Sequence, residues 1–207
     1  HYACDKFVPA FSPEFLRECI EQVDVVSLPL KDGESVQAMC DKLFPVMFDP
    51  KVMPKRVNQA DGEDLVMTSA ANYYEGVTQD EAEKFYAMQK VAADPHPVMY
   101  GMNSRLVKKD GVLQEEVWKL DGMYGEAIQK IIFWLEKAET VAENEAQREV
   151  IRLLIDFYRT GDLKTFDTYS IAWLKDTNSK VDFVNGFIES YGDPLGMKAS
   201  WESIVNF

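Results

Sequence analysis

The hydrophobic period of the chain changes sharply near residue 178, and this change constrains the fold more than any other feature. Between Tyr124 and Asn178, apolar residues recur every three to four positions, which is the spacing of one face of a helix. From Val181 onward, apolar and polar residues alternate, as they do along a strand. The chain must therefore combine helices with a sheet, and we predict an α+β fold that is predominantly helical with β-hairpins.

Residues that cap a first turn mark where helices start. Thr78 and Glu81 form a capping box, in which each side chain accepts a hydrogen bond from the other residue's backbone N–H. The predicted helices begin at about Ser12, Glu34, Thr78, Tyr124, Asn144 and Asp162. Pro45 and Gly161 are expected to end the second and the fifth of them. The apolar stripe of the last helix predicts an inward face made of Phe166, Ile171, Ala172 and Leu174.

Two β-hairpins are predicted. Asp110-Gly111, which readily adopts positive φ angles, joins a strand over 104–109 to one over 112–119. A closing hairpin joins 181–191 to 200–207 through the turn at Asp193–Gly196. Because no repeat or long linker divides the chain, residues 1–207 are expected to form a single α+β unit.

Composition excludes several classes of partner. The formal net charge of −13 opposes binding to nucleic acid and to anionic membrane surfaces. It suits cationic or amine-bearing ligands, although an acidic surface also serves simply to keep a protein dispersed. No apolar run approaches the roughly 18 residues that a membrane span needs. We therefore expect neither nucleic acid nor membrane as a partner.

The sequence carries no self-sufficient catalytic motif. It lacks the G-x-S-x-G, G-x-x-x-x-G-K-S/T, G-x-G-x-x-G and H-E-x-x-H patterns. The two histidines, His1 and His96, do not begin a zinc motif, and Cys4, Cys19 and Cys40 are too widely spaced for a C-x-x-C pair. We expect these cysteines to be small buried residues, and we expect no metal to be bound by this chain alone.

The strand over 181–191 carries the candidate site. Strict alternation places Phe187, Glu189 and Tyr191 on one face, so that a carboxylate and a phenol project side by side. A carboxylate binds an ammonium group through charge-assisted hydrogen bonds, and a phenol can donate to a carbonyl or to the oxyanion formed from it. Glu202, across the turn, offers a second carboxylate. The plainer alternative is a solvated strand whose polar residues serve only the fold.

The closing hairpin also resembles a known family. Gly186–Gly196 reads G-F-I-E-S-Y-G-D-P-L-G and is similar to the signature G-F-I-E-S-Y-R-D-P-F-G of the dipeptidyl peptidase III family. Segments 72–76, 103–108 and 124–144 are similar to the same family, especially to its Bacteroides-type bacterial members, so the resemblance covers nearly the whole chain. The sequence departs at Gly192, where eukaryotic relatives carry arginine.

The resemblance implies a two-lobed zinc exopeptidase that removes dipeptides from the amino terminus of oligopeptides. The family's H-E-x-x-G-H motif is missing from this sequence. The zinc motif is therefore expected C-terminal to Phe207, and this chain is expected to form mainly the lobe opposite the zinc. By the same resemblance, Glu189 and Glu202 hold the substrate's amino group, and Tyr191 is the catalytic residue that stabilises the attacked carbonyl.

The resemblance also implies partners and a cellular location for the chain. Its partners would be oligopeptide substrates and the remaining lobe of the same polypeptide, and the fragment alone would be inactive. Eukaryotic relatives suggest a cytoplasmic location, with an export signal upstream of His1 as the alternative. The competing hypothesis for function is a stand-alone, non-catalytic module that binds peptides or amines.

Overall fold

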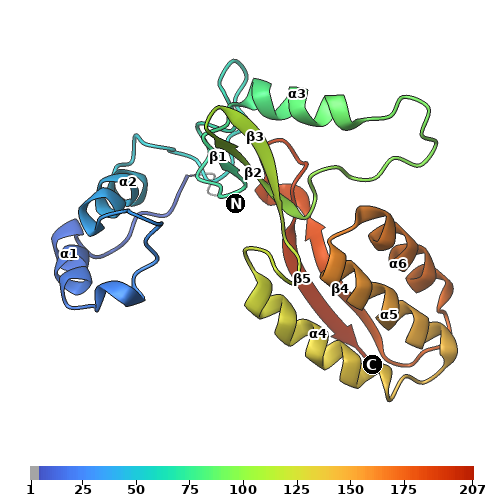
Figure 1. The fold of residues 1–207 in the computed structure, drawn as a ribbon. Coiled ribbons are helices and arrows are strands. Elements are labelled where there is room, and N and C mark those ends of the chain that lie inside the picture. The colour runs from blue at the N-terminus through green and yellow to red at the C-terminus, as the bar shows by residue number, and fades with distance from the viewer. Residues whose placement is uncertain (1–4) are drawn as a thin grey trace. The chain divides into compact units, whose positions relative to one another are not determined.

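The computed structural model describes residues 5–207, and their contacts group into two compact units (Figure 1). One unit extends to Ala71 and the other begins at Asn72. The sequence analysis expected a single unit because no linker of distinctive composition divides the chain. The residues up to Ala71 make most of their contacts among themselves, so each unit is described separately.

The N-terminal unit is organised around two helices, α1 (Pro13–Glu21) and α2 (Val36–Phe48), with a short 3-10 turn, η1 (Val25–Ser27), between them. The ring of Phe11 contacts those of Phe15 and Phe48, with 6.0 Å between centroids in both pairs. Ser12 accepts a hydrogen bond from the N–H of Phe15, which confirms the predicted cap.

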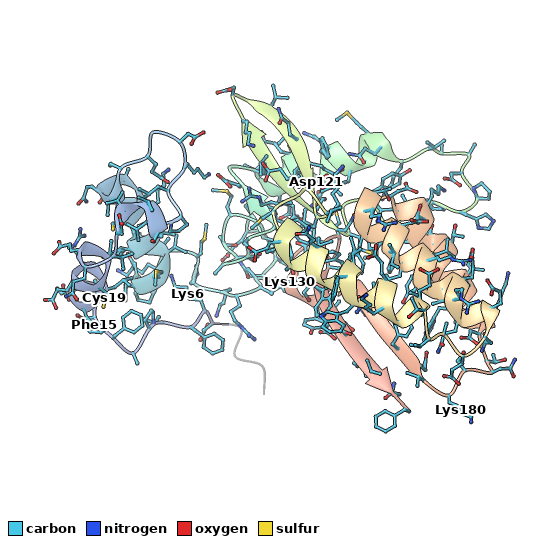
Figure 2. The ribbon with its side chains drawn as sticks, turned by 60° about the horizontal axis from the view of Figure 1, so that its bottom comes forward. Lys6, Phe15, Cys19, Asp121, Lys130 and Lys180 are labelled. Atoms are coloured by element: carbon cyan, nitrogen blue, oxygen red, sulfur yellow. The ribbon has the colours of Figure 1, made fainter. Side chains whose placement is uncertain are left out.

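Pro45 does not end α2 as predicted, because the helix continues to Phe48. The N–H of Asp49 donates to the carbonyl of Pro45 at 3.0 Å, which completes the last turn. Lys6 (Figure 2) donates from Nζ to the carbonyls of Val46 and Asp49, both at 2.6 Å. An ammonium group at these terminal carbonyls favours the final turn and offsets the bond that proline cannot make.

The cysteine prediction holds only in part. Cys40 is buried on α2, whereas Cys19 is exposed on α1. Cys4 lies outside the described residues.

The C-terminal unit begins with a three-stranded sheet of order β1-β2-β3, formed by β1 (Tyr74–Glu75), β2 (Ser104–Lys109) and β3 (Val112–Val117). β1 is parallel to β2, and β3 is antiparallel to it. Asp110 and Gly111 have φ values of 51° and 79°, which confirms the predicted hairpin turn. Helix α3 (Gln79–Gln89) starts at the predicted Thr78 capping box and packs Ala82 and Tyr86 against Leu106.

Three consecutive helices lie beside the second hairpin of this unit (Figure 1). They are α4 (Gly125–Glu139), α5 (Glu145–Thr160) and α6 (Leu163–Lys175), and the hairpin pairs β4 (Asp182–Glu189) with β5 (Ser200–Asn206). Helix α5 contacts both α4 and α6 and buries Val150, Ile151, Leu154, Ile155, Phe157 and Tyr158. The protein is thus mostly helical with small sheets, as predicted.

The predicted inward face of helix α6 is confirmed only in part, because Phe166 packs against α5 but Ile171 and Leu174 do not turn inward. Tyr169 is its buried residue, whereas Ile171 and Leu174 are 53% and 68% exposed. The ring of Phe166 lies 4.8 Å from that of Phe157 on α5 and 5.6 Å from that of Tyr169. Aromatic contacts therefore set the rotation of the helix, which the aliphatic residues alone did not indicate.

Gly161 ends α5 in the left-handed conformation, with φ of 72°, and a Cβ there would collide with the side chain of Val117. Gly161→Ala is expected to lower the free energy of unfolding by about 1–3 kcal/mol more than Gly111→Ala, because both strain the backbone but only the first also overpacks the core. Gly111 is a matched control, since its φ is 79° and a Cβ there meets no neighbouring atom. Urea unfolding measures both changes, and equal losses would contradict the expectation.

Candidate functional site: two carboxylates and a phenol on the closing hairpin

A β-bulge near the end of β4 decides which side chains share a face. Phe187 pairs with Trp201, but Glu189 pairs with Ser200, so Ile188 is the extra residue. The predicted common face for Phe187 and Glu189 is therefore wrong, because one inserted residue reverses the alternation. After the bulge, Glu189 lies on the face of Ser200 and Glu202, and Phe187 lies on the opposite face with Trp201.

Tyr191 follows the strand in a short 3-10 turn, η2 (Ser190–Gly192), rather than on the strand itself. Its side chain is 71% exposed, and its Oη donates a hydrogen bond to Oε1 of Glu202 at 2.7 Å. The structure thus brings Tyr191 and Glu202 into contact across the turn, with Glu189 on the same side of the hairpin as Glu202.

The charge around Tyr191 keeps its phenol protonated. The hydrogen bond to Glu202 is the main cause that raises the pKa of Tyr191, followed by the negative charges of Glu202 and Glu189. A protonated phenol beside two carboxylates is a donor next to two acceptors. This arrangement can bind an ammonium group at the carboxylates and donate a hydrogen bond to a carbonyl oxygen close by.

The turn between these residues is held by a buried carboxylate that sequence reasoning treated only as a turn former. Asp193 is 3% exposed, and its Oδ2 accepts hydrogen bonds from the N–H groups of Met197 and Lys198, both at 2.8 Å. The same oxygen accepts a bond from Tyr74 Oη on β1 at 3.0 Å. The turn is therefore tied both to itself and to the three-stranded sheet.

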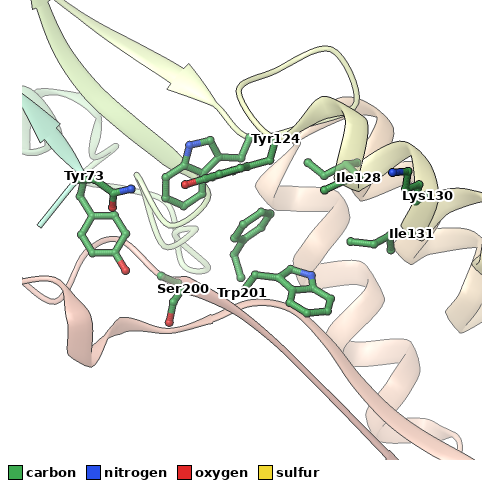
Figure 3. A pocket seen from close by; sticks show the side chains of 12 residues that line it. Tyr73, Tyr124, Ile128, Lys130, Ile131, Ser200 and Trp201 are labelled. Atoms are coloured by element: carbon green, nitrogen blue, oxygen red, sulfur yellow. The ribbon is translucent and has the colours of Figure 1, made fainter. Parts of the chain in front are cut away.

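An apolar cavity of about 480 Å³ lies beside the hairpin, against Phe187, Ser200 and Trp201 (Figure 3). Its wall includes Tyr73, Trp118, Tyr124, Ile128, Phe187 and Trp201. The indole N–H of Trp201 donates to Tyr158 Oη on α5 at 2.7 Å, which fixes the ring at the cavity. The sequence analysis did not predict this cavity, because its aromatic residues come from separate segments that only the fold brings together.

Two features are absent from the part of the chain that the structure describes. Residues 5–207 contain no group of three or more His, Cys, Asp or Glu side chains suited to hold a metal ion. None of the helices there is both long and apolar enough to cross a bilayer.

Comparison with known proteins places this hairpin in a family context. Residues 66–207 match Peptidase family M49. The "Dipeptidyl peptidase 3" proteins of Rattus norvegicus and Homo sapiens are 32% and 33% identical to this chain over 84 residues, which is 41% of this chain but 11% of either relative. The structure of DPP III from Caldithrix abyssi shares the fold over 93% of this chain and 34% of its own, with a TM-score of 0.53 and 18% identity.

The contact between Tyr191 and Glu202 predicts a measurable titration. Glu202→Gln is expected to lower the pKa of Tyr191 toward 10, because the neutral amide no longer disfavours the phenolate. Glu189→Gln should lower it less, since Glu189 acts through its charge alone. A pH titration of ¹³Cζ-labelled tyrosine by NMR measures these shifts, with Glu83→Gln on exposed α3 as control. An unchanged pKa in Glu202→Gln would contradict the geometry.

Proposed function

Because this chain belongs to Peptidase family M49, we propose that it supplies the substrate-binding residues of a zinc-dependent dipeptidyl peptidase. In this proposal the full-length protein removes dipeptides from the amino terminus of oligopeptides. The observation that carries the proposal is the cluster of Glu189, Glu202 and Tyr191 on one side of the closing hairpin.

Glu189 and Glu202 are assigned to the free amino group of the peptide. An ammonium group bound by the two carboxylates would form charge-assisted hydrogen bonds with them. An anchor of this kind fixes the distance from the amino terminus to the scissile bond, which an exopeptidase must measure. The chain's net charge of −13 favours the approach of a cationic end.

Tyr191 is assigned to the carbonyl that is attacked. In the free protein its hydroxyl donates to Glu202 at 2.7 Å. When Glu202 instead accepts hydrogen bonds from the substrate's ammonium, the phenol is released to donate to the carbonyl oxygen. A phenol, whose ordinary pKa is about 10, keeps its proton at neutral pH, so Tyr191 stabilises the developing oxyanion as a neutral donor. Amine binding and carbonyl activation are thereby coupled through one hydrogen bond.

Zinc belongs to the full-length protein in this proposal. The residues that the structure describes do not provide a cluster of metal ligands, so they do not fit the ion by themselves. We assign the zinc ligands to the remaining lobe of the same polypeptide and derive no catalytic step through the metal. The 207-residue chain alone is accordingly expected to bind peptides without cleaving them.

The competing function is a stand-alone module that binds peptides or amines without hydrolysis. The exposed carboxylate and phenol pair supports it, because that pair can bind an amine in the absence of a metal. The two functions differ in whether the natural full-length protein releases dipeptides.

The deciding experiment measures release of dipeptides from a chromogenic dipeptidyl substrate by the full-length protein. Release is expected to stop on removal of zinc by a chelator and to require a free amino terminus, so the N-acetylated substrate should be inert. Glu189→Ala is expected to raise KM about tenfold or more, because a charged hydrogen bond to the ammonium is lost. Tyr191→Phe should mainly lower kcat, by about tenfold to a hundredfold.

Glu83→Ala is the matched control, since Glu83 is an exposed carboxylate on α3 away from the hairpin. No release by well-folded, zinc-loaded protein, together with binding of free dipeptides that depends on Glu189, would favour the binding module instead.

A further inference from the structure

Lys198 is a lysine whose side chain is completely buried. It lies in the segment 193–199, which connects the turn carrying Tyr191 to the strand carrying Glu202, and it is 0% exposed. Its Nζ donates to Tyr86 Oη at 2.6 Å, to Ser104 O at 3.1 Å and to Ser104 Oγ at 3.2 Å, with Gly101 O at 3.4 Å. The hydrogen bonds of this ammonium therefore all go to α3, to β2 and to the residues just before β2.

Two hydroxyl groups link the ammonium of Lys198 to the carboxylate of Glu115, which balances its charge. Tyr86 Oη and Ser104 Oγ each donate to Oε1 of Glu115 on β3, at 2.9 and 2.6 Å. The rings of Tyr74 and Tyr86 also face Nζ, at 5.4 and 4.8 Å from their centroids. Burial lowers the pKa of Lys198 to about 8, and the charges of Glu115 and Asp193 oppose that shift. The side chain is thus an ammonium at neutral pH.

Neighbouring contacts tie the same segment down on both sides of Lys198. The N–H of Ala199 donates to the carbonyl of Met102 at 2.8 Å, and Asp193 accepts from Tyr74. Gly101, with φ of 84°, allows the backbone to lie against the Tyr86 ring, because a Cβ there would come within 2.7 Å of a ring carbon. The ammonium is held in a site shaped to receive it.

Burying a lysine is costly, and an apolar side chain of similar size would often serve stability as well or better. The ammonium adds a defined position, because its hydrogen bonds to Tyr86 and Ser104 set where the backbone of Lys198 lies. We propose that Lys198 is a positioning residue, which fixes segment 193–199 so that Tyr191 and Glu202 meet. Its effect on peptide cleavage rests on the proposed function, whereas its effect on the Tyr191–Glu202 contact does not.

The first test reads the geometry without activity. In Lys198→Met, the ¹³Cζ signal of Tyr191 at pH 7 is expected to move toward its value in Glu202→Gln, which lacks the carboxylate acceptor. Lys109→Met is the matched control, because Lys109 is an exposed lysine whose Nζ pairs with Glu116 at 2.6 Å. A Tyr191 signal that moves no more in Lys198→Met than in Lys109→Met would overturn the proposal.

The second test is a double-mutant cycle on kcat/KM of the full-length enzyme. Lys198→Met is expected to lower kcat/KM about tenfold in the natural background but by less than about twofold in Glu202→Gln, since it acts through that residue. Equal losses in both backgrounds would indicate general destabilisation and would overturn the positioning role.

One outcome separates this inference from the proposed function, and a second variant guards against misfolding. If the full-length protein releases no dipeptides but the Tyr191 signal moves as expected, the positioning role stands and the peptidase function fails. If Lys198→Met does not fold, Tyr86→Phe takes its place, because it removes the 2.6 Å partner of Nζ and keeps the ring. An unmoved Tyr191 signal in folded Tyr86→Phe would then overturn the proposal.

Discussion

The buried carboxylate of Asp193 is the interaction on which the closing hairpin depends. A carboxylate removed from water is destabilising unless its oxygens are satisfied, and here they accept three backbone N–H groups and one phenol hydroxyl. The bonds to Leu195, Met197 and Lys198 close the turn on itself, and the bond to Tyr74 joins it to the first sheet. Because Tyr191 and Glu202 flank this turn, Asp193 contributes to their separation before any ligand is present.

The same hairpin separates two kinds of chemistry by face. Phe187 and Trp201 face an aromatic cavity, where Trp118 lies 5.1 Å from Phe187 between ring centroids. Glu189 and Glu202 lie on the other side, close to water. An apolar cavity lowers the local dielectric and would make a nearby unpaired carboxylate costly. The hairpin thus carries apolar and charged side chains within a few residues of each other.

Local chemistry explains what the sequence predicted well. The caps at Thr78 and Asp162, the Gly161 terminus and the Asp110-Gly111 turn each depend on residues within one turn of each other, and the structure has them all. The predicted end at Pro45 was wrong because Lys6, which donates to the last turn, lies 40 residues before Val46. The face of α6 was predicted only in part because aliphatic spacing does not register the aromatic contacts of Phe166 with Phe157 and Tyr169.

The candidate site shows the same limit. Strand alternation and the family resemblance both picked out Glu189, Tyr191 and Glu202, but alternation wrongly put Glu189 on the face of Phe187, because a bulge has no signature in hydrophobic alternation. The partners of Lys198 are about a hundred residues away in the chain, so no local pattern could indicate its burial. The one signal in the sequence was the position of Lys198 itself, a charged residue between Met197 and Ala199 in a run of mostly uncharged neighbours.

The bulge at Ile188 makes the length of this segment matter as much as its side chains. Inserting one residue between Ser200 and Trp201 would give Ile188 a partner, restore regular alternation and turn the Glu189 carboxylate toward the face of Phe187, while every functional residue type remained in the sequence. An insertion or deletion here would therefore disturb the arrangement of the site more than an exchange of residues outside it. Anyone transplanting this anchor onto another scaffold would need to copy the irregular strand, and not only its acidic residues.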